Sequence, residues 1–180
     1  LLEYLEEVNP QKNNFVVISG GPGTGKTYTV SKILALIAEQ YIHANVERNI
    51  ALTAPTGKAA ARLSAVIKDA KTKINCSEAV KMLIPETAST THRLLGSTFK
   101  KKEFRFNEDN LLPYDAIIVD EASMIDLPLM AKLMSATPRH ARFIMLGDKE
   151  QLASVEPGAV FGDICNAGEN ISDSVVVLQK

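Results

Sequence analysis

The sequence has no tryptophan, two cysteines and no long uninterrupted apolar run. Cys76 and Cys165 lie far apart and neither belongs to a CxxC pair, which argues against a zinc site or a disulfide framework. The apolar stretches are far shorter than the roughly 20 residues that a membrane helix needs. A basic start followed by an apolar block, the pattern of an export signal, is also missing. These absences predict a cytoplasmic protein without a membrane segment.

The composition is that of a single globular domain over residues 1–180, with 46% hydrophobic and 23% charged residues. The net charge of -1 conceals an uneven distribution. Residues 58–105 hold eleven Lys or Arg against four Asp or Glu, and the rest of the chain is acidic. Such a basic segment can attract a polyanion such as nucleic acid, or it can be a solvated face.

Short apolar runs alternate with helix-like segments. Between residues 30 and 38, apolar side chains recur at spacings of three and four, which predicts a helix beginning near Lys26. A second helix is expected to begin at Asp126, a good capping residue, with Pro128 in its first turn. The alternation predicts an α/β fold with a mostly parallel sheet and helices on both faces. Five runs read as buried strands: residues 15–18, 50–52, 116–119, 143–146 and 175–178.

The strongest motif lies between the first predicted strand and its helix. Residues 20–27 match the phosphate-loop pattern GxxxxGK[ST], although a Gly-rich turn without a ligand is the alternative. Glycines allow backbone N–H groups to wrap phosphates at positive φ. Lys26 would supply charge to the β and γ phosphates, and Thr27 a hydroxyl to Mg²⁺. The motif therefore predicts ATP and Mg²⁺ as cofactors, held by Gly20, Gly21, Pro22, Gly23, Thr24, Gly25, Lys26, Thr27 and Tyr28.

Two adjacent carboxylates follow the third predicted strand. Asp120 is predicted to hold Mg²⁺, and Glu121 to orient and deprotonate the attacking water. By themselves they could equally be a helix cap or a loop. Gln151 follows the fourth strand, where an amide could bond the γ phosphate and lose that contact after hydrolysis. The predicted catalytic set is thus Lys26, Asp120, Glu121 and Gln151.

Two segments in the basic region combine hydroxyls with cations. Residues 53–58 and 89–93 carry the groups that grip nucleic-acid phosphates without reading bases. Each could instead be a helix N-cap, for which Thr56 and Ser89 are suited. Residues 98–106 interleave Lys, Phe and Arg and read either as an exposed β-hairpin or as a solvated loop. His43 and His140 have no evident partners and are expected at the surface or in packing.

Taken together, residues 20–27, 53–63, 89–96, 120–124 and 146–163 resemble superfamily 1 DNA helicases, and most closely the RecD group. Three strings carry the resemblance to RecD: APTGKAAARL at 54–63, THRLLG at 91–96 and GDKEQLASV at 147–155. The resemblance implies a RecA-like P-loop NTPase fold. It also implies the α subunit of exodeoxyribonuclease V, an ATP-driven motor that moves 5′ to 3′ on single-stranded DNA with RecB and RecC in double-strand break repair and recombination.

The resemblance assigns further roles. It implies that Gln151 senses the γ phosphate and that a small hairpin insertion at about 97–112 replaces the strand-separating hairpin of relatives. A second RecA-like domain, with an arginine finger, is expected outside this chain, so that the chain alone would be inactive or weakly active. The DNA contacts that it implies are Thr53, Pro55, Thr56, Lys58, His92 and Arg93.

Two other functions are compatible with the phosphate loop. A small-molecule kinase shares it, although Glu121 beside Asp120 suits activation of water and the basic region has no obvious small substrate. A module that holds nucleotide and partner subunits without turnover is the third possibility.

Overall fold

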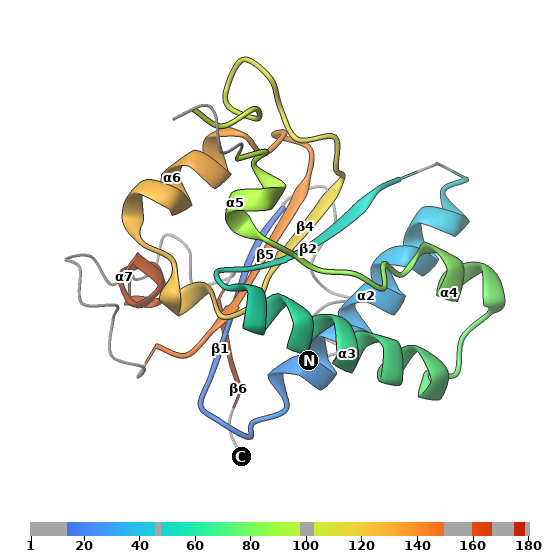
Figure 1. Ribbon diagram of the computed structural model, residues 1–180. Helices are drawn as coiled ribbons and strands as arrows, with labels where there is room; N and C mark the ends of the chain where they lie inside the picture. The colour runs from blue at the N-terminus through green and yellow to red at the C-terminus, as the bar shows by residue number, and fades with distance from the viewer. Residues whose placement is uncertain (1–13, 46–47, 98–102, 150–159, 167–174, 179–180) are drawn as a thin grey trace.

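The computed structural model describes residues 14–45, 48–97, 103–149, 160–166 and 175–178. At its centre is a sheet with the strand order β3-β2-β4-β5-β1-β6 (Figure 1). Every adjacent pair of these strands is parallel. The strands are β1 (Phe15–Gly20), β2 (Ile50–Ala54), β3 (Ser89–Thr90), β4 (Ala116–Val119), β5 (Arg142–Gly147) and β6 (Val175–Leu178).

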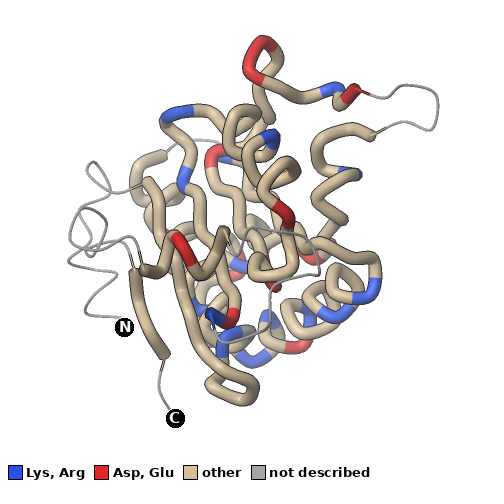
Figure 2. The backbone as a smooth tube through the Cα atoms, turned by 90° about the vertical axis from the view of Figure 1, so that its left-hand side faces the viewer, with Lys and Arg blue, Asp and Glu red and all other residues tan. Residues whose placement is uncertain are grey.

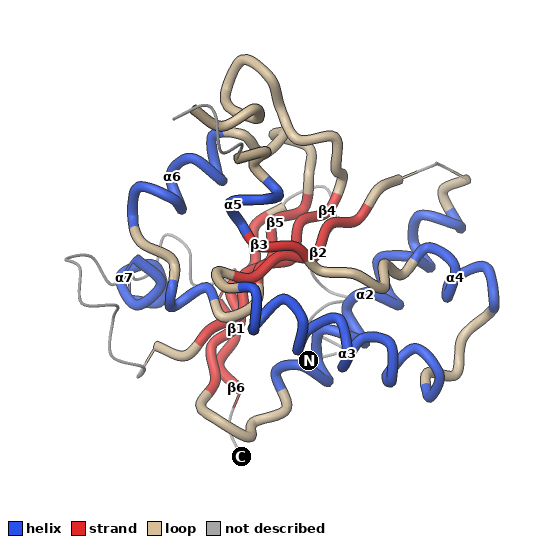
Figure 3. The backbone as a smooth tube through the Cα atoms, viewed as in Figure 1, coloured by secondary structure: helices blue, strands red, loops and turns tan. Residues whose placement is uncertain are grey.

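Helices lie on both sides of this sheet (Figure 3). On one side are α2 (Lys26–His43), α3 (Gly57–Lys73) and α4 (Glu78–Leu83). On the other side are α5 (Thr91–Leu94), α6 (Leu127–Ser135) and α7 (Val160–Asn166), together with the short 3-10 helix η1 (Ala122–Met124). The expected α/β fold, with a parallel sheet covered on both faces, is confirmed.

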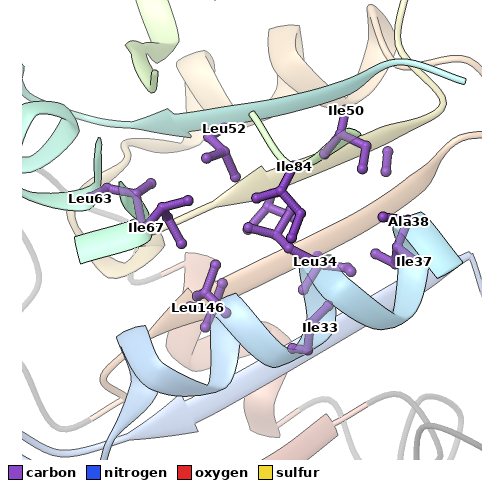
Figure 4. Close-up of a cluster of buried hydrophobic side chains, with 14 of the residues drawn as sticks. Ile33, Leu34, Ile37, Ala38, Ile50, Leu52, Leu63, Ile67, Ile84 and Leu146 are labelled. Atoms are coloured by element: carbon purple, nitrogen blue, oxygen red, sulfur yellow. The ribbon is translucent and has the colours of Figure 1, made fainter. Parts of the chain in front are cut away.

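The side chains of each central strand alternate between two apolar clusters. In β4, Ala116 and Ile118 face the cluster formed with α2, α3 and α4, whereas Ile117 and Val119 face the cluster formed with α5, α6 and α7. Figure 4 shows the first cluster, in which Leu34 of α2 and Ile67 of α3 pack beneath β2. Because both faces are buried, these strands read as continuous apolar runs in the sequence.

The local signals in the sequence predicted most boundaries correctly. Helix α2 begins at Lys26, directly after Gly25, whose φ of 83° places it in the left-handed region. Helix α6 begins after Asp126, whose side chain accepts a 2.7 Å hydrogen bond from the Leu129 N–H. All five predicted strands are present. The sixth strand, β3, was not predicted, because two polar residues make no apolar run.

The described part of the predicted insertion packs against the end of α5. The Phe106 N–H donates to the Leu95 carbonyl at 3.0 Å, and Asn107 and Asn110 form an isolated antiparallel bridge. Residues 98–102, the basic part of the expected hairpin, lie outside the described residues. Within the described part of the chain, no helix is long and apolar enough to cross a membrane.

Candidate active site

The phosphate loop forms a tight turn between β1 and α2. Gly23 and Gly25 both have positive φ, at 77° and 83°, so an L side chain would be strained at either position. The Thr24 hydroxyl donates to the Gly21 carbonyl at 2.9 Å and closes the turn. The Lys26 ammonium donates to the carbonyls of Gly20 and of Gly21, the latter at 3.0 Å, so its charge lies inside the loop.

The two carboxylates at the end of β4 have different backbone conformations and surroundings. The Asp120 N–H donates to the Thr53 carbonyl at 2.9 Å, and its carboxylate accepts from the Glu121 N–H at 2.9 Å. Glu121 has a φ of 52°, in the left-handed region where non-glycine residues are strained. Strain of this kind concentrates at functional sites, because the surrounding fold must hold it.

Burial raises the pKa of Asp120 above its ordinary value. The Glu121 N–H opposes this rise, the charge of Glu121 adds to it, and the cations Lys26 and Arg62 oppose it. A half-buried carboxylate with a raised pKa is one whose negative charge the protein does not fully compensate. A bound divalent cation would supply that compensation.

These two segments face one pocket of about 360 Å³ at the carboxyl edge of the sheet. It combines main-chain N–H groups of the loop, a lysine and two carboxylates, the groups that a magnesium-bound triphosphate requires. Among the described residues, no group of three or more His, Cys, Asp or Glu could hold a metal. In proteins that bind a magnesium-bound triphosphate, phosphate and water oxygens supply much of the coordination of the metal. The lining residues are Gly21, Pro22, Gly23, Gly25, Lys26, Tyr28, Arg62, Asp120, Glu121, Ser123, Gly147 and Asp148.

Four lining residues are not among the predicted site residues: Arg62, Ser123, Gly147 and Asp148. Arg62 extends from α3, and its guanidinium lies 3.9 Å from the Glu121 carboxylate. Asp148, which is 5% exposed, follows β5, and its N–H donates to the Ser123 hydroxyl at 3.5 Å. Arg62 and Asp148 fall within the strings at 54–63 and 147–155 that carry the resemblance, and Asp148 also follows a predicted strand, at the edge where parallel sheets bind ligands. The position of Arg62 in the sequence gives no sign that it shares a pocket with the phosphate loop.

Gln151 and the side chain of Thr27 lie outside the described residues. Tyr28 lines the pocket and is 64% exposed, with the Lys32 ammonium 5.4 Å from the centre of its ring.

The two segments predicted to contact DNA lie side by side. Strand β3 pairs with the end of β2, with Thr53 opposite Ser89 and Ala54 opposite Thr90. The starts of α3 and α5, which follow β2 and β3, therefore lie at the same carboxyl edge of the sheet. Figure 2 shows Lys and Arg recurring along α3, which contributes Lys58 to this edge.

The predicted DNA contacts differ in their exposure to solvent. Thr56, Lys58, His92 and Arg93 are exposed, and Pro55 is half-buried. Thr56 caps α3, as the alternative interpretation expected, whereas α5 is capped by Thr90 instead of Ser89.

Thr53 is completely buried, and its hydroxyl donates to the Ser89 carbonyl at 3.1 Å. Its side chain therefore reaches no surface in this structure.

Comparison with known proteins identifies the family. A family described as an AAA domain matches residues 6–157. The chain belongs to this family. Membership implies use of a nucleotide, and the pocket of this AAA domain has the groups to bind one.

The relatives of this AAA domain include RecD subunits. It is 48% identical over 157 residues to the RecBCD enzyme subunit RecD of Haemophilus influenzae, covering 85% of this chain and 24% of that protein. The RecD subunit of Mycobacterium tuberculosis is 48% identical over 166 residues, with 91% and 28% covered. The ATP-dependent RecD2 DNA helicase of Deinococcus radiodurans is 38% identical over 167 residues, with 93% and 20% covered. The resemblance to RecD is confirmed, and the chain spans about a quarter of the length of these relatives.

Solved structures with the same fold include DNA helicases. The Pif1 helicase from Candida albicans superposes with a TM-score of 0.58 at 18% identity, covering 99% of this chain and 39% of that one. Bacteroides Pif1 bound to single-stranded DNA gives 0.51 at 20% identity, with 99% and 41% covered. The expected RecA-like P-loop fold is thereby confirmed.

Proposed function

We propose that this AAA domain is the ATP-binding motor domain of a RecD-type DNA helicase. It binds ATP with Mg²⁺, hydrolyses it, and in the intact protein drives 5′ to 3′ movement along single-stranded DNA. The observation that carries the proposal is the single pocket onto which the phosphate loop with Lys26 opens opposite Asp120 and Glu121.

The residues predicted to form the ATP site have distinct tasks in this proposal. The loop N–H groups bind the phosphates, and Lys26 exchanges its contacts with loop carbonyls for the β and γ phosphate oxygens. Asp120 and the Thr27 hydroxyl hold Mg²⁺, which when bound neutralises phosphate charge. Glu121 accepts a proton from the attacking water, and Gln151 senses the γ phosphate.

The surface at the carboxyl ends of β2 and β3 is the proposed DNA surface. Thr56, Lys58, His92 and Arg93 are exposed there, and Pro55 lies beside them half-buried. Hydroxyl and cationic side chains bind the phosphate backbone without reading the bases, as a motor that must move over any sequence requires. Thr53 contributes from the interior, by holding this edge in place.

The proposed partners follow from the relatives. Proteins named as RecBCD enzyme subunits match most of this chain. On that basis we propose RecB and RecC as partners, a role in double-strand break repair and recombination, and a cytoplasmic location. A second motor domain and its arginine finger would complete the ATP site in the intact protein.

Lys26→Ala in the intact protein tests the proposal. We expect DNA-stimulated ATP hydrolysis to fall by about a hundredfold or more, because the ammonium stabilises charge that develops on the transferred phosphoryl group. Lys73→Ala is the matched control, since Lys73 pairs with Asp69 on the exposed face of α3. Unchanged turnover in Lys26→Ala, with circular dichroism reporting a folded protein, would contradict the assigned site.

A further inference from the structure

Two buried threonine hydroxyls meet where β2, β3 and α5 join. Thr53 of β2 and Thr91 of α5 both have no exposed surface. The Thr53 hydroxyl donates to the Ser89 carbonyl at 3.1 Å, and the Thr91 hydroxyl donates to the Ala54 carbonyl at 3.3 Å. The two hydroxyl oxygens are 3.4 Å apart.

Core packing does not require these hydroxyls. The other residues of β2 are Ile50, Ala51, Leu52 and Ala54, all apolar and buried. Valine has nearly the shape of threonine and would fill the same space without a polar group that must be satisfied. The hydroxyls therefore fix the position of β3 and α5 against the end of β2, a task that apolar contacts perform with less directional control.

The main chain of Thr53 is also hydrogen-bonded to Asp120, which lines the nucleotide pocket. Its carbonyl accepts the Asp120 N–H at 2.9 Å, and it is paired in register with Val119, the last residue of β4. On the other side, Thr91 is the first residue of the short helix α5 that carries the exposed His92 and Arg93. Thr53 and Thr91 thus stand between the proposed DNA surface and Asp120.

We propose that Thr53 and Thr91 are positioning residues that couple DNA binding at α5 to ATP hydrolysis at Asp120. When His92 and Arg93 bind a strand of DNA, α5 shifts. The two threonine hydroxyls transmit this shift to the end of β2, and from there to the main chain of Asp120. Hydrogen bonds in a buried, low-dielectric setting suit this task, since breaking them is unfavourable and their geometry is directional. This inference rests on the proposed function and adds the route by which DNA regulates the same site.

The test uses Thr53→Val and Thr91→Val in the intact protein, with ATP hydrolysis measured against the concentration of single-stranded DNA. We expect the DNA-dependent increase in rate to fall by about tenfold in each variant, corresponding to about 1.4 kcal/mol of coupling, and by a larger factor than the DNA-independent rate. The double variant should lose little more than either single one, because the two hydroxyls act as a pair.

Thr137→Val is the matched control. The Thr137 hydroxyl donates to the Leu133 carbonyl at 2.7 Å, beyond the end of α6, and Thr137 does not line the nucleotide pocket. It should leave the response to DNA unchanged.

Two outcomes overturn the inference. Equal losses of the DNA-dependent and DNA-independent rates would mean that the hydroxyls only support the fold, and an unaltered DNA response would mean that they carry no coupling. If instead the wild-type protein hydrolyses ATP without any response to DNA, the proposed function itself fails, and the inference with it.

Discussion

The two ends of strand β4 carry aspartates in opposite situations. Asp115 precedes the strand at the amino edge of the sheet and Asp120 follows it at the carboxyl edge. The carboxylate of Asp115 pairs with Arg48, accepts the Asn49 N–H at 2.9 Å and lies 3.4 Å from the His140 imidazole. The main chain of Asp115 also bonds to Asn49, to Arg142 and to the Tyr41 hydroxyl.

The pKa values of the two aspartates differ in direction. Burial tends to raise the pKa of Asp115, but the Asn49 N–H and the Arg48 guanidinium outweigh it, and the pKa is lowered. Burial dominates at Asp120, and its pKa is raised. At the amino edge the fold thus supplies the partners of its own carboxylate. At the carboxyl edge the fold does not fully compensate the charge of Asp120, and a bound cation can do so. This difference separates a structural carboxylate from a functional one.

Asp120→Asn gives the largest expected effect. We expect Mg²⁺-dependent ATP hydrolysis to fall by about a hundredfold or more, because a metal ligand that stabilises the transition state is lost. The melting temperature at neutral pH should be equal or higher, since a half-buried carboxylate with a raised pKa is replaced by a neutral amide. Steady-state kinetics and thermal melting measure both, and a variant with normal hydrolysis would remove Asp120 from the metal site.

Asp115→Asn should have the opposite profile. Loss of the charge that pairs with Arg48 is expected to lower the free energy of unfolding by about 1 kcal/mol, since the pair is partly exposed and Asn can still accept the Asn49 N–H. ATP hydrolysis in the intact protein should stay near the wild-type rate. Urea unfolding tests the first expectation. A stable variant with impaired hydrolysis would show that the amino edge matters for function.

The pH dependence gives the smallest expected effect and sharpens the comparison. Asp115, with a lowered pKa, contributes stability above the unfolded-state value of about 4, and this is lost as the pH falls through its folded value. Asp120, with a raised pKa, destabilises the fold above its folded value, and this effect vanishes as the pH falls below about 4.

Relative to wild type, Asp115→Asn should therefore be less stable and Asp120→Asn equally or more stable at about pH 7. The Asp120→Asn difference should shrink as the pH falls toward about 4, whereas the Asp115→Asn difference should persist to about pH 4 and shrink only below it. Urea titrations of the three proteins across this range are the measurement. Differences that stay constant with pH would mean that neither carboxylate titrates differently in the folded and unfolded chain.

The parts of the site that were predictable depend on local sequence. The phosphate loop, the start of α2 at Lys26 and the position of Asp120 and Glu121 after a strand all follow from neighbouring residues. These signals predict the structure correctly, because a phosphate loop and the end of a buried strand have similar local geometry in different proteins.

Other features depend on contacts between distant segments. Arg62 enters the pocket from α3, and Asp148 reaches it from the end of β5. The burial of Thr53, predicted as a DNA contact, results from the two-residue strand β3 that covers the end of β2. The spacing of residues along the chain does not predict which distant segments come into contact.

The sequence by itself determined the alternation of strands and helices, the phosphate loop and the acids that face it, because periodicity and turn chemistry act over a few residues. Only the tertiary structure decided which strand lies beside which, and so which motifs share an edge. In the order β3-β2-β4-β5-β1-β6, β5 separates the two halves of the nucleotide pocket, and Thr53 is enclosed beneath the proposed DNA surface. Hydrogen bonds between strands fix that order, and each strand could in principle pair with several others.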